Sequence, residues 1–140
     1  MSDRKNVLMI CTDHWSGSLL GCAGRKDIMT PTLDYLANNG IRYENFYSEC
    51  PVCIPARRSM MTGLTPKTHG DRAYADRMPM PDVPTLAETF RENGYQTMAV
   101  GKLHVYPQRN RIGFEDVILT EEGRYEMGAV DDYQIWLGEH

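Results

Sequence analysis

The sequence predicts an α/β fold in which a mainly parallel sheet is flanked by helices. Segments typical of strands alternate with segments typical of helices along the chain, the pattern of parallel sheets covered by helices. Residues 7–12 form a nearly continuous apolar run, as expected of a parallel strand that is buried on both faces. The helical segments also carry recognisable start and stop residues.

The first half of the chain is predicted to hold two strands, at residues 7–12 and 41–47, around one helix. Thr30 is a typical N-cap, Pro31 suits the first helical position, and Gly40 follows the last helical turn. Residues 41–47 are rich in aromatic and β-branched side chains, which favour strands.

The second half is predicted to hold three helices and one further strand. The first of these helices starts at or next to Cys53, has Pro55 in its first turn and ends at Gly63. Residues 71–83 lack a clear period and form a loop. The remaining elements are a helix opened by the capping box of Thr85 and Glu88 and closed by Gly94, a strand over 95–100, and a last helix marked by Ala129, Tyr133, Trp136 and Leu137.

Composition limits the functional classes that the chain fits. Its 140 residues form at most one domain, 1–140, and the net charge of −4 argues against a nucleic-acid partner. No apolar run approaches the roughly 20 residues that a membrane span needs. The apolar run near the N-terminus is too short for a signal sequence, so the chain is predicted to be cytoplasmic, with no membrane partner.

The spacing of two cysteines raises two possible functions, a thiol-redox site and a structural zinc site. Cys50 and Cys53 form a C-x-x-C pair, which would suit a thiol-redox site, although the surrounding chain does not match the small redox fold. A structural zinc site needs about four ligands, and the sequence has no second C-x-x-C pair. In a cytoplasmic chain free thiols are expected rather than a disulfide framework.

The candidate site residues share one topological position. Asp13 follows the first predicted strand, Cys53 follows the second, and Lys102 and His104 follow the third. Ligands of open parallel sheets bind at the carboxyl ends of the strands. A helix N-terminus also stabilises negative charge at Cys53, and Arg57 lies one helical turn later.

Two motifs carry a resemblance to a known family. Cys53-Ile-Pro-Ala-Arg57, within residues 51–63, and the segment from Gly94 to Lys102 and His104 resemble the signatures of the type I sulfatases. The match runs from Asn6 to about Glu115, and it departs at Ala56, where sulfatases usually carry serine. This resemblance implies an alkaline-phosphatase-like fold. It also implies that the chain is the N-terminal part of a longer catalytic domain and is inactive alone.

The resemblance also implies roles for the candidate residues. Cys53 would be oxidised to formylglycine, the catalytic aldehyde, by a formylglycine-generating or maturase enzyme. Arg57 would hold the hydrated aldehyde, Lys102 would grip the substrate oxyanion, and His104 would serve the hydroxyl at residue 53. Asp13 and residue 53 would bind a divalent metal, with Ca²⁺ favoured and Mn²⁺ as the alternative.

Three functions follow from these motifs, and the oligomeric state is left open. The first is hydrolysis of small-molecule sulfate esters. The second is hydrolysis of phosphonate monoesters or phosphodiesters on the same scaffold, because His14 stands where many sulfatases have a second aspartate and Trp15 resembles relatives with that activity. The third is an inactive fragment, or a thiol-redox or binding module.

Overall fold

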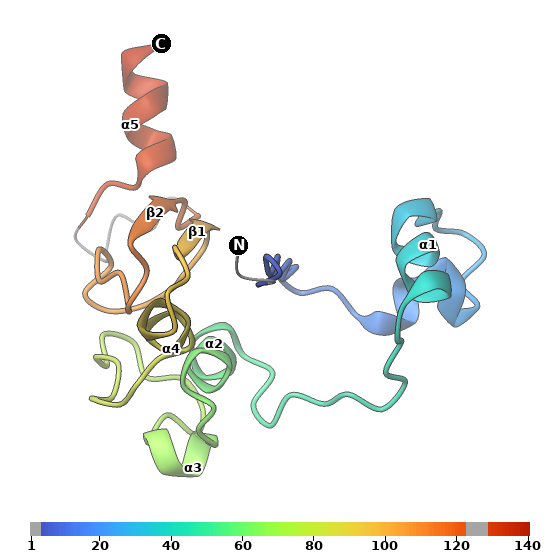
Figure 1. Cartoon of the computed structure of the whole chain (residues 1–140), viewed down its shortest axis with the longest axis horizontal. Coiled ribbons are helices and arrows are strands. Elements are labelled where there is room, and N and C mark those ends of the chain that lie inside the picture. The colour runs from blue at the N-terminus through green and yellow to red at the C-terminus, as the bar shows by residue number, and fades with distance from the viewer. Residues whose placement is uncertain (1–3, 123–128) are drawn as a thin grey trace. The chain divides into compact units, whose positions relative to one another are not determined.

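The chain divides into two compact units, Met1–Phe46 and Tyr47–His140. The structure, a computed structural model, describes residues 4–122 and 129–140, and Figure 1 labels the principal helices and strands. The mixture of helices with a small parallel sheet agrees with the predicted α/β class.

The first unit is built on helix α1, Pro31–Asn39, and on two short 3-10 helices, Gly17–Leu19 and Gly21–Ala23. Helix α1 starts where Thr30 and Pro31 predicted it to start. The Thr30 hydroxyl accepts a hydrogen bond from the Gly21 amide at 2.8 Å and donates one to the Asp34 carboxylate at 3.0 Å. The Cys22 amide donates to the same carboxylate, and this hydrogen bond is the main cause of the lowered pKa of Asp34.

The predicted strands at residues 7–12 and 41–47 are absent from the structure. Neither segment pairs with a neighbouring strand in the described part of the chain, and the side chains of 7–12 lie largely in solvent, with Leu8 84% exposed. Both predictions were wrong for this chain on its own. A buried parallel strand needs a paired strand and helices on both faces, and the described residues 4–46 hold only helices and irregular segments.

The second unit carries the remaining elements. They are α2, Cys53–Thr62; α3, Pro66–His69; α4, Leu86–Glu92; β1, Met98–Gly101; β2, Asp116–Leu119; and α5, Asp132–Glu139. Several predicted boundaries are confirmed. Helix α2 begins at Cys53 and ends before Gly63, which takes a left-handed φ of 68°, and Thr85 with Glu88 forms the predicted capping box of α4.

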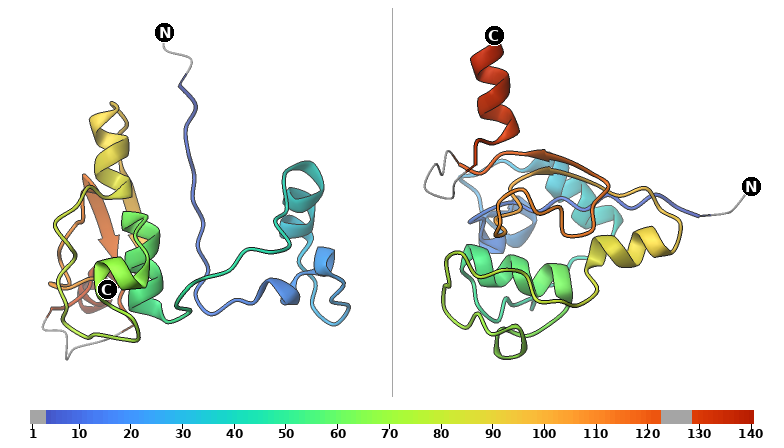
Figure 2. Two further views of the ribbon diagram at one scale, coloured as in Figure 1. Left: turned by 90° about the horizontal axis from the view of Figure 1, so that it is seen from below. Right: turned by 90° about the vertical axis from the view of Figure 1, so that its left-hand side faces the viewer.

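The two strands of this unit pair in parallel, with Met98 opposite Asp116 and Gly101 opposite Leu119. The segment between them returns across the unit and supplies much of its core. This core contains Met61, Leu103, Val105, Ile112 and Leu119, all buried. Figures 1 and 2 show α2 and α4 near the two-stranded sheet. Met61 is the residue that α2 contributes to this core. Burial of these apolar side chains away from water is the main favourable contribution to the packing of α2.

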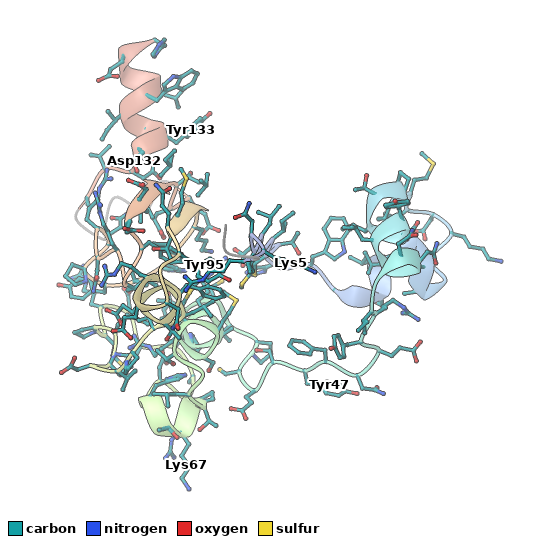
Figure 3. The ribbon with its side chains drawn as sticks, in the orientation of Figure 1. Lys5, Tyr47, Lys67, Tyr95, Asp132 and Tyr133 are labelled. Carbon is teal, nitrogen blue, oxygen red and sulfur yellow. The ribbon has the colours of Figure 1, made fainter. Side chains whose placement is uncertain are left out.

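Helix α5 is attached to the end of β2 through its first residues. Asp131 caps the helix by accepting a hydrogen bond from the Gln134 amide, and the neighbouring Asp132, labelled at the base of the helix in Figure 3, accepts one from the Leu119 amide at 2.6 Å. In the described part of the chain, no helix combines the length and the apolar character that a membrane crossing demands.

Candidate functional site

Cys53 is the first residue of α2, as the sequence predicted. Val52 provides the N-cap in an extended conformation, and the Ala56 amide makes the first helical hydrogen bond to the Val52 carbonyl at 3.0 Å. The Cys53 side chain is half-buried. The positive end of the helix dipole therefore lies at residue 53, where it would stabilise negative charge developing on that side chain.

Arg57 connects α2 to the segment that follows β1. Its guanidinium Nη1 donates a hydrogen bond to the Lys102 carbonyl oxygen at 2.5 Å. Residues four apart on a helix lie on the same face, so Arg57 and Cys53 share the face of α2 that meets this segment. The structure thus brings together two motifs that are 45 residues apart in sequence.

Lys102 directly follows the carboxyl end of β1, and its ammonium group is engaged by an acidic residue. Lys102 Nζ lies 2.7 Å from Glu122 Oε1; the lysine side chain is 9% exposed, whereas that of the glutamate is 47% exposed. The ammonium group is therefore fixed near the protein surface. A bound anion would share or replace the Glu122 carboxylate as its partner.

His104 is buried, with 2% of its surface exposed, and it takes a left-handed φ of 55°. Its backbone amide and that of Leu103 each donate a hydrogen bond to Oε1 of Glu121, both at 2.8 Å. Glu121 is itself 2% exposed. Burial raises the pKa of the Glu121 carboxyl, while the two amides and the charges of Arg57 and Lys102 act in the opposite direction.

Glu121 was missed by the sequence analysis, although a signal was present. It lies two residues after the end of β2, close to where Lys102 follows β1, and β2 itself was not predicted. The short apolar run of Val117, Ile118 and Leu119 after Gly113 is that signal. Had it been recognised as a parallel strand, its carboxyl end would have pointed to Glu121 and Glu122.

Asp13 and His14 belong to the first unit, and Cys53 belongs to the second. Asp13 Oδ1 lies 3.9 Å from His14 Nε2, and His14 takes a left-handed φ of 54°. Asp13 offers a hard carboxylate oxygen, the ligand type that Ca²⁺ prefers. The metal site shared by Asp13 and residue 53 stays a prediction.

The two thiols of the C-x-x-C pair are separate in the structure. Cys50 and Cys53 are not joined by a disulfide. The Cys50 thiol instead donates to the Arg72 carbonyl oxygen, with a distance of 3.6 Å from sulfur to oxygen. Cys50 is therefore held by the loop after α3, whereas Cys53 lies on the helix.

Arg58 of α2 and Asp71 are two buried residues of opposite charge that influence each other electrostatically. The sequence analysis left Arg58 out of the predicted site. The structure buries it to 2% exposure, and its guanidinium donates to the carbonyl oxygens of Met78 at 2.7 Å and Pro79 at 2.5 Å. Burial lowers the pKa of Arg58, and the negative charge of Asp71 opposes this change. Asp71 is 1% exposed, and among the described residues its carboxylate has no hydrogen-bond partner.

His69 links Asp71 to α2. The Asp71 amide donates to His69 Nδ1 at 3.2 Å, so Nε2 carries the proton of the neutral ring and donates to Ser59 Oγ at 2.9 Å. Protonation of Nδ1 would point a second hydrogen at that amide. Burial, followed by the charge of Arg58, lowers the pKa of His69, and Asp71 partly opposes them. These contacts favour a structural role for His69.

The lowered pKa of His69 predicts an acid-sensitive contribution to stability. The folded state favours the neutral ring, so the contribution is complete above the ordinary histidine pKa of about 6.5 and is lost as the pH falls from there towards the lower folded value. The free energy of unfolding of His69→Gln should be lower than that of wild type, and this difference should be smaller at pH 5 than at pH 7. Urea unfolding at several pH values measures this change. His140→Gln, which alters an exposed histidine, is the control, and an unchanged difference for His69→Gln would contradict the prediction.

Comparison with known proteins gives a consistent family match. The family model described as Sulfatase matches residues 5–138. The chain is 36% identical to an arylsulfatase of Clostridium perfringens over 97% of its own length and 31% of that protein. It is 37% identical to the human iduronate 2-sulfatase over 73% of its own length and 19% of that protein. The chain thus spans about a third or less of these relatives.

A solved structure shows a similar arrangement of the backbone. The chain described as Ps i-CgsB superposes with a TM-score of 0.69 and 26% sequence identity, over 91% of this chain and 31% of that one. The choline-sulfatase of Rhizobium meliloti is 31% identical over 94% of this chain and 25% of its own length.

Proposed function

Because the chain belongs to the sulfatase family, we propose that it is the N-terminal part of a catalytic domain that hydrolyses sulfate esters. Its nucleophile is formed at residue 53, after Cys53 has been oxidised to formylglycine. One observation carries the proposal: the cysteine of the matched motif begins α2, and Arg57, one turn later, is hydrogen-bonded to Lys102 of the second motif.

The reaction proceeds by covalent catalysis at residue 53. Formylglycine at residue 53 would supply, when hydrated, one hydroxyl as the nucleophile towards the ester sulfur and a second hydroxyl whose deprotonation allows sulfate to leave. The alcohol of the ester would leave with the proton of the attacking hydroxyl. His104 would accept the proton of the second hydroxyl.

The cationic side chains would stabilise the charge that develops during this reaction. Arg57 and Lys102 both belong to the segments that the structure joins by a hydrogen bond. Preorganised positive groups at a developing oxyanion are usually the largest contribution to such catalysis. In this proposal Lys102 exchanges its contact with Glu122 for a sulfate oxygen of the substrate.

Asp13 and the hydrated aldehyde at residue 53 would supply oxygen ligands for a divalent cation, with Ca²⁺ preferred over Mn²⁺. Two ligands are too few for Ca²⁺, which takes six to eight oxygens, so other residues of a complete catalytic domain would supply the rest. When bound, such a cation acts as a Lewis acid and lowers the pKa of a hydroxyl group.

A phosphonate monoester or a phosphodiester is the second candidate substrate. His14 favours it because it stands next to Asp13, where many sulfatases have a second aspartate, and Trp15 favours it because it resembles the tryptophan of relatives with that activity. The chemistry at residue 53 would be the same, with phosphorus in place of sulfur. A formylglycine-generating or maturase enzyme is the required partner in either case.

The full-length protein, purified from its native host, tests the proposal directly. We expect the Cys53 peptide to show the mass deficit that corresponds to replacement of CH₂SH by CHO. We also expect metal-dependent turnover of an aryl sulfate that exceeds turnover of an aryl phosphonate monoester. A Cys53 peptide that is entirely unmodified, with no turnover of either ester, would rule the proposal out; faster phosphonate turnover would select the second candidate.

A further inference from the structure

Glu121 is a buried carboxylate that is attached to the proposed site through the protein backbone. One of its oxygens, Oε1, accepts hydrogen bonds from the successive amides of Leu103 and His104. Glu121 is held in turn by its own amide, which donates to Asp131 Oδ2 at 2.7 Å. The adjacent Thr120 amide donates to the Gly101 carbonyl at 3.1 Å, so both strand ends are fixed at this point.

The segment that Glu121 holds is conformationally unfavourable without it. His104 has a φ of 55°, in the left-handed region that is unfavourable for a residue with a side chain. Successive amides around a left-handed residue form a concave site for an anionic oxygen, and here that oxygen belongs to Glu121. The carboxylate therefore stabilises the backbone conformation of Leu103 and His104. This conformation sets the directions in which the Lys102 and His104 side chains start from the backbone.

The charge of Glu121 is also placed near both cations of the proposed site. Arg57 and Lys102 are close enough to lower the pKa of its carboxyl against the opposing effect of burial. A neutral carbonyl oxygen could accept the two amide hydrogen bonds without the cost of burying a charge. The Glu121 carboxyl group thus holds the two amides and also lies within electrostatic reach of Arg57 and Lys102.

We propose that Glu121 is a positioning residue, which sets the orientation of Lys102 and His104 towards the substrate without touching it. This inference rests on the proposed sulfatase function. Misplacement of a catalytic group by about 1 Å can cost roughly 100-fold in rate. Glu121→Ala in the full-length enzyme should therefore lower kcat by about 10- to 100-fold, whereas Glu121→Gln, which keeps one acceptor oxygen, should recover part of that loss.

Hydrogen exchange provides a readout that does not depend on turnover. In Glu121→Ala the amides of Leu103 and His104 should exchange at least about 10-fold faster, because a net hydrogen bond of about 1.4 kcal/mol corresponds to that factor. The conversion of Cys53 to formylglycine should be unchanged. Glu115→Ala is the matched control, since its carboxylate accepts a hydrogen bond from the Thr97 amide at the opposite end of the strand pair. It should leave kcat within about twofold of wild type, as expected of surface changes.

The outcomes separate this inference from the function on which it rests. Unchanged exchange at residues 103 and 104 in Glu121→Ala overturns it, whether or not the enzyme is active. Faster exchange with kcat within twofold of wild type also overturns it, because the hydrogen bonds would then serve stability alone. A wild-type enzyme without ester turnover would instead defeat the proposed function, and Glu121 would then be a structural residue.

Discussion

Replacement of Cys53 by alanine in the full-length protein should abolish sulfate-ester turnover, with a loss on the order of 10³-fold or more in kcat. The proposed nucleophile is made from the Cys53 side chain, and loss of a covalent nucleophile removes the whole reaction path rather than one stabilising contact. Steady-state hydrolysis of an aryl sulfate measures the loss, and peptide mass analysis should show no aldehyde in the variant.

Cys50→Ala is the matched control for this experiment. Cys50 lies three residues earlier, and its thiol is hydrogen-bonded to the loop after α3. If residue 53 alone carries the nucleophile, Cys50→Ala should keep the aldehyde, and its turnover should stay within about threefold of wild type. A thiol that only donates a hydrogen bond to a carbonyl oxygen contributes little to stability. Equal losses in the two variants would favour a functional thiol pair and contradict the formylglycine proposal.

Helix boundaries in this protein follow from local signals, and for that reason the sequence predicted them well. The start of α2 at Cys53 and the capping box of α4 depend on residues within one helical turn. The left-handed Gly63 ends α2 for an equally local reason. This local control fixes residue 53 at a helix N-terminus even though the chain spans a minor part of its relatives.

The strands were harder to predict because strand pairing is not local. Residues 7–12 and 41–47 have strand-like composition, yet the described part of the chain offers them no neighbouring strand. Residues 116–119 form a strand because β1 is there to pair with them. Composition thus indicates what a segment can form, whereas the presence of a partner decides whether it forms.

The candidate site was predicted in part, for a similar reason. Arg57 and Lys102 could be linked in advance because both fall within motifs, and the structure joins them by a hydrogen bond. Glu121 lies outside both motifs and acts through amides 17 and 18 residues away in sequence. No spacing rule on one sequence predicts such a contact, and it becomes visible only when the ends of β1 and β2 are placed side by side.

Arg58 gives the largest stability effect that we expect. Arginine is almost never fully buried unless it is paired, and here the surrounding chain compensates it with two carbonyl oxygens and the charge of Asp71. Arg58→Met keeps much of the side-chain volume but leaves the Asp71 charge without compensation. The carbonyl oxygens of Met78 and Pro79 would also lose their donor, and each buried polar group left unsatisfied costs about 1–3 kcal/mol.

Equilibrium unfolding of the full-length protein in urea would measure this change in the free energy of unfolding. Arg91→Met, on the exposed face of α4, is the matched control and should alter that free energy by no more than about 0.5 kcal/mol. If Arg58→Met lowers the free energy of unfolding by less than about 1 kcal/mol, water or local rearrangement compensates the Asp71 charge without the guanidinium. That result would contradict the expected stabilisation by Arg58.

A double-mutant cycle with Asp71→Asn separates the charge pair from the carbonyl contacts. Asp71→Asn removes the carboxylate charge that Arg58→Met leaves uncompensated, so the double variant should be more stable than the sum of the two single losses predicts, by about 1–3 kcal/mol. The hydrogen bonds of Arg58 to Met78 and Pro79 are lost in both variants that lack it, so recovery should stay incomplete. Strict additivity would mean that the two charges do not interact. In that case the carbonyl oxygens of Met78 and Pro79, rather than Asp71, would keep the Arg58 side chain buried on the helix that carries Cys53.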